Sequence, residues 1–201
     1  MKAKTAESVG IKFHNASFKE KVTTEELVAE IEKLNQVPNM CGIIVQLPLP
    51  EHLDVRKILD AIDPLLDVDC LGSVASENFY NGKIDFGFPT ALACMELLTE
   101  PDIFLINKKI VVLGQGELVG KPVTALLKFK NLNPIPVASD TPNRQEIIKQ
   151  ADVIISGIGK GKYITASMIK EGVVLIDAGT SESNSSIVGD VDFEEVKNVA
   201  G

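Results

Sequence analysis

The chain has 201 residues, of which 45% are hydrophobic and 24% charged, and its formal net charge at pH 7 is -8. These proportions are typical of a globular protein that can bury a sizeable core in one or two domains. The acidic balance, with an isoelectric point of about 4.9, argues against nucleic acid as a partner.

Membrane and metal sites are not expected either. No apolar run approaches the roughly 18 residues that a membrane helix needs, and no hydrophobic signal segment follows Met1. Cys41, Cys70 and Cys94 form no CxxC pair and no metal-binding spacing. Scattered cysteines in odd number are typical of buried thiols in a reducing compartment, so we expect a cytoplasmic protein.

In the first half of the chain, helices and short strands are predicted to alternate. Apolar spacing and start signals predict helices at the opening residues up to Val9, from Thr23 through Leu34, at 55–62 and at 90–98. Strands are predicted at 11–14 and, as a buried run, at 41–46. Between them and the second half, residues 67–89 read as a loop with a turn at Asn81-Gly82.

From residue 109 onward, strand and helix alternate regularly. Strands are predicted at 109–113, 134–138, 153–156 and 173–177, and helices at 122–129, 143–149 and 166–169. Repeated strand–helix units predict a parallel, doubly wound sheet of the Rossmann type. We therefore expect an α/β fold in which two α/β domains, residues 1–100 and 101–201, flank a cleft.

Glycines follow two of these strands. Gly114, Gly116 and Gly120 come directly after the first strand and precede a helix, an arrangement that brings backbone close to a phosphate. Their spacing differs by one residue from the usual dinucleotide fingerprint, so a sharp turn without a ligand is the alternative. Gly157 and Gly159, after the third strand, either approach the cofactor closely or form a mobile turn.

A possible ribose-binding signal follows the second strand, at Ser139-Asp140-Thr141. Asp140 lies 20 residues beyond Gly120, and an acidic residue at this spacing can hydrogen-bond the adenine ribose and favour NAD over NADP. The alternative is that Asp140 or Thr141 caps the next helix.

Polar residues also follow the buried run of the first half. Gln46 ends that run and is followed by Leu47-Pro48-Leu49-Pro50, so its side chain is expected in the crevice where α/β sheets bind ligands. Asp67 and Asp69 lie on the next loop.

With these stretches the chain resembles the bifunctional methylenetetrahydrofolate dehydrogenase/methenyltetrahydrofolate cyclohydrolase family. The motifs occur in family order, and the most specific are VQLPLP (45–50) and GDVDF (189–193). The other matching stretches are Asp67-Val68-Asp69, 118–122, 151–155 and 176–179.

The resemblance implies a two-step reaction of one-carbon metabolism. Hydride passes from 5,10-methylenetetrahydrofolate to a nicotinamide cofactor, and the methenyl product is hydrolysed to 10-formyltetrahydrofolate. It also implies a homodimer formed through the cofactor domains, with residues 1–100 binding folate and 101–201 binding NAD(P).

Three residues would carry the chemistry if the family roles transfer. Lys2 falls on the catalytic lysine, Gln46 on the glutamine that orients it, and Asp69 on the aspartate that binds the pterin. A lysine with a pKa lowered by desolvation can transfer protons. From the residues alone, Lys2 could be an exposed surface lysine, Gln46 could satisfy loop backbone, Asp69 could be a turn residue, and Asp67 could share or replace its role.

The resemblance also assigns binding residues. Pro48, Leu49 and Thr90 would contact the substrate together with Gln46 and Asp69. The residues assigned to the cofactor are Gly114, Gln115, Gly116, Leu118, Val119, Gly120, Ser139, Asp140, Gly157, Gly159 and Thr180. NADP is the cofactor usual in the family, but Gln115 stands where many members carry an arginine for the 2′-phosphate. Together with Asp140, this favours NAD.

The chain departs from the family pattern at several positions. Cys70 replaces a preferred glycine, and Ala91 replaces the last proline of a Pro-Cys-Thr-Pro signature. Judged by that pattern, the chain is expected to be truncated at both ends, without the partner tyrosine, the first strand and the C-terminal helix. The alternative function is therefore a non-catalytic homologue that binds nucleotide or a partner. Another two-domain dehydrogenase sharing only the fold is disfavoured by the string from Gln46 to Pro50.

Overall fold

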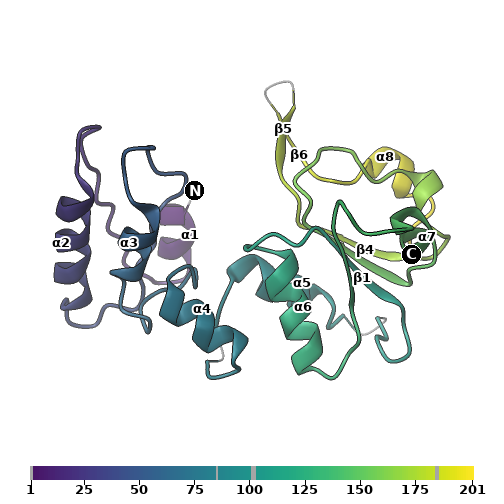
Figure 1. Ribbon diagram of the computed structural model, residues 1–201, viewed down its shortest axis with the longest axis horizontal. Helices are drawn as coiled ribbons and strands as arrows, with labels where there is room; N and C mark the ends of the chain where they lie inside the picture. The colour runs from purple at the N-terminus through teal and green to yellow at the C-terminus, as the bar shows by residue number, and fades with distance from the viewer. Residues whose placement is uncertain (1, 85, 101–102, 184–185) are drawn as a thin grey trace.

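A computed structural model describes residues 2–84, 86–100, 103–183 and 186–201. Helices of the first half lie at one end of the molecule and a parallel sheet lies at the other, with α5 and α6 between them (Figure 1). The first-half helices are α1 (Lys2–Ser8), α2 (Thr24–Asn35), α3 (Val55–Asp60) and α4 (Ser73–Tyr80).

The helix predicted from Thr23 is confirmed as α2, and its start is stabilised as the sequence suggests. The Thr23 hydroxyl oxygen accepts from the Glu26 amide at 3.2 Å, and the Glu26 carboxylate accepts from the Thr23 amide at 2.8 Å. Two amides that the helix would leave unpaired thus find partners. The opening helix and the helix near Val55 are confirmed as α1 and α3.

The two strands predicted in the first half are not formed. Residues 11–14 are irregular, and the run 41–46 is reduced to one parallel bridge between Ile43 and Asp67, where the Ile43 amide donates to the Leu66 carbonyl at 2.7 Å. Ile44 is 39% exposed. A strand needs a neighbour on at least one edge over several residues, and the described part of the chain supplies only this bridge.

Helix α4 lies inside the segment predicted to be a loop. It starts after Gly72, which offers no side-chain cap; instead the Asp60 carboxylate accepts from the Ser73 amide at 2.6 Å. The capping group therefore comes from another helix, and local sequence could not reveal it. The turn predicted at Asn81-Gly82 is confirmed, with Gly82 at φ 65°.

The second half forms the predicted four-stranded parallel sheet in the order β2-β1-β3-β4. This confirms the α/β class and the Rossmann-like arrangement. The strands are β1 (Ile110–Leu113), β2 (Ile135–Val137), β3 (Val153–Ser156) and β4 (Val174–Asp177). The helices around them are α5 (Pro89–Leu97), α6 (Gly120–Phe129), α7 (Arg144–Lys149), η1 (Ala166–Met168) and α8 (Phe193–Val196).

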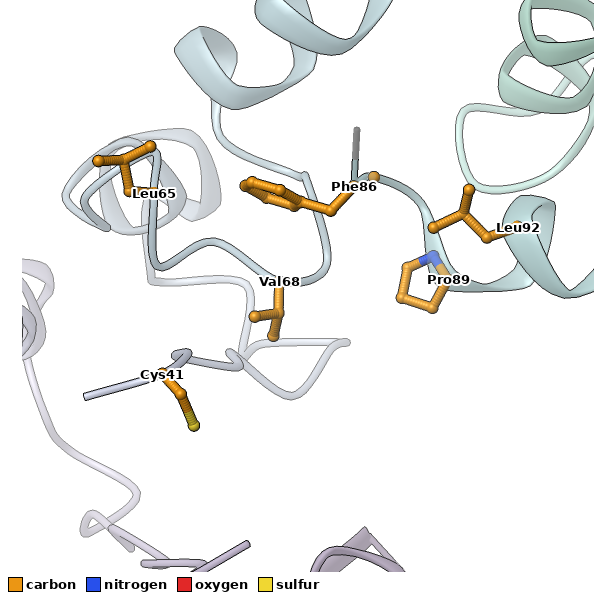
Figure 2. A pocket seen from close by; sticks show the side chains of 7 residues that line it. Cys41, Leu65, Val68, Phe86, Pro89 and Leu92 are labelled. Atoms are coloured by element: carbon orange, nitrogen blue, oxygen red, sulfur yellow. The ribbon is translucent and has the colours of Figure 1, made fainter. Parts of the chain in front are cut away.

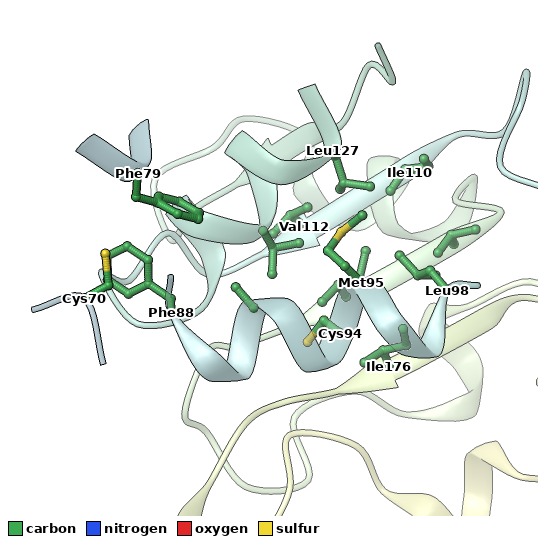
Figure 3. Close-up of a cluster of buried hydrophobic side chains, with 14 of the residues drawn as sticks. Cys70, Phe79, Phe88, Cys94, Met95, Leu98, Ile110, Val112, Leu127 and Ile176 are labelled. Carbon is green, nitrogen blue, oxygen red and sulfur yellow. The ribbon is translucent and has the colours of Figure 1, made fainter. Parts of the chain in front are cut away.

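Helices cover both faces of the sheet. Successive residues of a strand point to opposite sides, so neighbouring residues of β1 pack against helices on different faces. Val112 packs with Met95 of α5 and Leu127 of α6 on one face (Figure 3). Val111 packs with Ile148 of α7 on the other. Helix α5 thus shares the core of the sheet, although it precedes the domain boundary predicted after residue 100; that boundary stays a prediction. A separate apolar cluster holds α2 and α3 together.

A two-stranded hairpin after β4 and the short helix α8 were not anticipated. The hairpin consists of β5 (Ser181–Ser183) and β6 (Ser186–Val188), which pair antiparallel and project from the sheet (Figure 1). Three-residue strands rich in serine carry no alternating pattern, so periodicity could not identify them.

Candidate functional site

A hollow of about 280 Å³ lies at the carboxyl ends of β1, β3 and β4. This is the edge where parallel α/β sheets bind ligands. Of the residues predicted to bind a cofactor, those that line it are Gly116, Leu118, Val119, Gly157, Gly159 and Thr180. Motif reasoning missed the other lining residues, which are Glu117, Ile158, Ala178 and Gly179.

Gly114 and Gly120 do not line the hollow but shape the loop behind it. Gly114 adopts φ 81°, which residues with a side chain rarely adopt, and it lies against the Gly157 backbone. At Gly120, a Cβ would overlap the Gly114 carbonyl. Both glycines therefore let the β1 loop fold tightly onto the start of α6 and onto the β3 loop.

Glu117 is the charged residue of the lining, and Lys121 forms an ion pair with it one helical turn later. The remaining wall is glycine backbone and small or apolar side chains. A wall of this kind allows backbone to approach an anionic group closely, because its glycines have no side chain to intervene and its one carboxylate is paired.

Three predicted cofactor residues, Gln115, Ser139 and Asp140, are not part of the wall of the hollow. Gln115 is half-buried, and its Nε2 donates to the carbonyls of Gly114 and Val112. Ser139 and Asp140 are exposed beyond the end of β2. Neither Asp140 nor Thr141 caps α7, which was the alternative role: the N-cap position is Asn143, without a side-chain bond.

Asp69 and Lys2 are brought into electrostatic range of one another. Asp69 is half-buried, and its removal from water raises the pKa of its carboxyl group. The positive charge of Lys2 opposes this rise, whereas the negative charge of Asp67 adds to it. Lys2 itself is exposed on α1. The pairing joins two predicted site residues that are distant in sequence.

Asp67 has a different role from Asp69. It is 1% exposed, and its carboxylate accepts from the Gly72 amide at 2.7 Å, which closes the loop that leads into α4. The next buried residue, Cys70, adopts φ 59° where the family prefers glycine. Burial and the nearby Asp67 charge raise the pKa of the Cys70 thiol to about 11, so this thiol is unreactive.

Gln46 bonds locally. Its Nε2 donates to the Leu47 carbonyl at 2.8 Å, which is the backbone role that the sequence left open. Pro48, which follows a cis peptide bond, is exposed, Leu49 is half-buried, and Thr90 is exposed in the first turn of α5. The structure therefore brings Lys2 near Asp69, while Gln46 is engaged with its own loop.

A second hollow, of about 260 Å³, is lined by residues adjacent in sequence to Asp69 and Thr90 (Figure 2). Val68 and Pro89 in its wall directly precede Asp69 and Thr90. Sequence reasoning missed this apolar wall, because its members come from separate loops without a shared period. The other lining residues are Cys41, Leu65, Phe86, Gly87 and Leu92.

The residues described by the structure include no helix long and apolar enough to cross a membrane. Within the same residues, no group of three or more His, Cys, Asp or Glu side chains is placed to hold a metal ion.

Comparison with known proteins gives matches over nearly the whole chain. Residues 1–69 match the family described as Tetrahydrofolate dehydrogenase/cyclohydrolase, catalytic domain, and residues 89–201 match its NAD(P)-binding domain. The bifunctional protein FolD of Desulforamulus reducens is 39% identical over 197 residues, covering 98% of this chain and 69% of the relative. That of Clostridium novyi is 42% identical over 193 residues, covering 96% and 69%.

Solved structures agree. The bifunctional FolD methylenetetrahydrofolate dehydrogenase/cyclohydrolase of Campylobacter jejuni superposes with a TM-score of 0.91 at 35% identity, over 99% of this chain and 71% of that one. The Trypanosoma brucei enzyme, solved with NADP cofactor and an inhibitor, superposes with a TM-score of 0.88 at 32% identity, over 99% and 71%.

Proposed function

Because this chain belongs to the tetrahydrofolate dehydrogenase/cyclohydrolase family, we propose that it oxidises 5,10-methylenetetrahydrofolate with a nicotinamide cofactor and hydrolyses the methenyl product to 10-formyltetrahydrofolate. The observation that carries the proposal is the glycine-lined hollow at the carboxyl edge of the parallel sheet. Its wall suits a dinucleotide, since a Cβ at Gly116 would meet open space and the loops after β1, β3 and β4 converge there.

The cofactor, when bound, supplies the hydride acceptor. Backbone of Gly116, Gly157 and Gly159 would hold its phosphates, and Leu118, Val119 and Thr180 would complete the wall. Gly114 and Gly120 act indirectly by holding the loop in shape.

Asp69 accepts hydrogen bonds from the amine and amide donors of the pterin ring. Its half-buried position suits this role, because a partly dehydrated carboxylate gains more from such bonds than an exposed one. Lys2, on the neighbouring helix, transfers protons to and from folate nitrogen or water, and Gln46 orients it. For the latter role the Gln46 amide must leave its bond with the Leu47 carbonyl.

The pteridine and benzoyl parts of the folate rest on apolar surface beside Asp69. Pro48, Leu49 and Thr90 contribute to this surface together with the wall of the second hollow, where Val68 and Pro89 flank Asp69 and Thr90.

The choice of cofactor depends on residues outside the hollow. NADP is the cofactor bound in the Trypanosoma brucei relative. In this chain Gln115 is turned toward its own backbone, and Asp140 places an exposed carboxylate just past β2, where the carboxylate that binds the adenine ribose stands in Rossmann folds. These two features favour the use of NAD in addition to NADP.

Assembly and location complete the proposal. The chain forms a homodimer through its cofactor half, in the cytoplasm. Ile187 on the hairpin and Phe193 at the start of α8 are 82% and 67% exposed, so this half carries apolar surface that a second copy could cover.

The test is to follow absorbance of the methenyl product when methylenetetrahydrofolate is supplied with NAD or NADP. Turnover supports the proposal, and Lys2→Met is expected to abolish hydrolysis of the methenyl compound. Unchanged hydrolysis in that variant would reject the role of Lys2. Calorimetric titration separates the alternative: dinucleotide binding with neither folate binding nor turnover would indicate a non-catalytic homologue.

A further inference from the structure

The Asp190 carboxylate is fully buried directly behind the dinucleotide hollow, and it is 0% exposed. One oxygen accepts from the Ser156 hydroxyl and from the Ile158 amide, both at 2.7 Å. The other accepts from the Lys160 amide at 2.8 Å. Burying a carboxylate costs free energy unless hydrogen-bond donors surround it. The loss of any one of these three bonds would therefore leave the buried charge less well compensated.

The three donors alternate along the chain with two glycines that line the hollow, and the middle donor, Ile158, lines it as well. Ser156, Ile158 and Lys160 are held by Asp190, and Gly157 and Gly159 lie between them. In a planar peptide the N–H and C=O groups point in opposite directions, so fixing the Ile158 amide also fixes the Gly157 carbonyl. That carbonyl lies against Gly114 in the β1 loop. Asp190 thereby sets the position of one wall of the hollow relative to the other.

A second carboxylate holds the backbone that carries Asp190. Asp177, at the end of β4, accepts from the amides of Asp190 and Val191, each at 3.0 Å. It also accepts from the Gly179 amide at 3.0 Å. Gly189 approaches so closely that a Cβ there would overlap the Asp177 carboxylate. The end of β4 is thus linked through Asp190 to the loop after β3.

We propose that Asp190 is a positioning residue of the dinucleotide site: it holds the β3 loop in the shape that admits the cofactor, and Asp177 supports it from behind. The inference rests on the proposed function, because the occupant of the hollow is taken to be the dinucleotide. Asp190 is not itself a lining residue; it acts on the wall from behind, through its bonds with Ser156, Ile158 and Lys160.

The test compares Asp190→Asn with Asp152→Asn, a change at a carboxylate that directly precedes β3, at the opposite end of that strand from Ser156. Asp152 accepts from the Lys109 amide and from the Lys170 ammonium, both at 2.6 Å, and its neighbours do not line the hollow. Three measurements are made on the full chain: affinity for NAD and NADP by calorimetry, hydrogen exchange of residues 156–160, and the thermal unfolding midpoint.

We expect Asp190→Asn to weaken dinucleotide affinity by about 10-fold or more and to accelerate exchange at Ile158 and Lys160. Asp152→Asn should lower the unfolding midpoint and leave dinucleotide affinity unchanged. Ser156→Ala removes only the hydroxyl donor and should shift affinity in the same direction as Asp190→Asn by a smaller factor. If Asp190→Asn does not fold, the dinucleotide affinity of Ser156→Ala tests the proposal in its place.

Two results overturn the inference. One is a folded Asp190→Asn variant with wild-type affinity and exchange; the other is an equal loss of affinity in Asp152→Asn, which would reduce the effect to general destabilisation. If the wild-type chain binds neither NAD nor NADP, the proposed function fails instead, and the exchange of Ile158 and Lys160 still decides whether Asp190 holds the loop.

Discussion

The Gln115 side-chain amide donates to the Gly114 carbonyl at 3.0 Å, so this side chain turns back onto the glycine loop that carries it. The same nitrogen also lies 3.3 Å from the Val112 carbonyl. Because backbone engages the amide, we expect the charge of Asp140, beyond the neighbouring strand, to be the main determinant of how the proposed site receives a 2′-phosphate.

We expect Asp140→Ser to raise affinity for NADP relative to NAD by about 10-fold, since it removes a negative charge near the position that the proposed site would give the 2′-phosphate. Adding Gln115→Arg should raise this ratio further, because guanidinium binds phosphate through paired donors. Calorimetric titration with both cofactors gives the ratio. Glu171→Gln, a change at an exposed carboxylate remote from the hollow, is the control. An unchanged ratio in the double variant would contradict this assignment.

Two glycines of the same loop should respond differently to alanine. At Gly120 a Cβ would overlap the Gly114 carbonyl, so Gly120→Ala is expected to lower the free energy of unfolding by about 2 kcal/mol or more. At Gly116 a Cβ meets no protein atom within 4 Å, and Gly116→Ala should leave stability within about 0.5 kcal/mol of wild type.

The same pair separates stability from binding. Because Gly116 lines the hollow, its alanine variant should still weaken dinucleotide affinity. Urea unfolding and calorimetric titration of both variants check the two effects. A stable Gly116→Ala protein with wild-type affinity would show that the dinucleotide does not approach this loop.

We expect the Asp69 carboxylate to lower the stability of the folded protein at neutral pH while it contributes to folate binding. Burial raises the pKa of its carboxyl group in the folded protein, so the folded state holds the proton more tightly than the unfolded state. The protonated Asp69 carboxyl group contributes fully to the stability of the folded protein below the ordinary Asp pKa of about 3.9. This contribution is lost as pH rises through the higher pKa that Asp69 has in the folded protein.

Asp69→Asn is therefore expected to unfold at a higher temperature than wild type at pH 7, with an advantage that shrinks on acidification, and to lose folate affinity. Thermal unfolding across pH and titration with folate measure both. Asp67→Asn is the contrasting variant: it disturbs the buried bond to the Gly72 amide and should destabilise the protein at pH 7. A less stable Asp69→Asn protein would contradict the burial argument.

The stability that the Asp152–Lys170 ion pair contributes should change with pH in the opposite direction to that of Asp69. Hydrogen bonds from Lys170 and from the Lys109 amide lower the pKa of Asp152 in the folded protein. Its stabilising effect is present above the ordinary Asp pKa of about 3.9 and disappears as pH falls through the lower folded value. Lys170→Met should cost about 1 kcal/mol at pH 7 and nothing once Asp152 is protonated. Urea unfolding at several pH values tests this, and a pH-independent loss would point to packing instead.

Local features of the sequence were sufficient for the parallel sheet. The runs at β1 and β3 each begin with three β-branched residues and bury all four of their residues. Each is followed by glycine, so strand and turn could be predicted without tertiary information. The capping residues Thr23 and Glu26 likewise determine where α2 begins.

Tertiary structure decided the features that depend on contacts between distant segments. The run around Ile43 has strand-forming residues, but among the residues that the structure describes only Asp67 forms a bridge with it, and α4 is capped by Asp60 from another helix. Asp67 and Asp69 look alike in the sequence; only burial and the bond to Gly72 distinguish a structural carboxylate from one available to a ligand.

Asp190 is the clearest case. The sequence by itself determined the fold class, the glycine loop and the resemblance that assigns Gln46, Asp69 and Lys2. It also marked GDVDF as specific but assigned no role to the first of its two aspartates, Asp190. That role became visible only when folding placed this carboxylate against donors at the end of β3 and in the loop after it, thirty or more positions earlier. A hydrogen bond of this kind depends on position in space, which the packing of β3 and β4 supplies and sequence spacing does not.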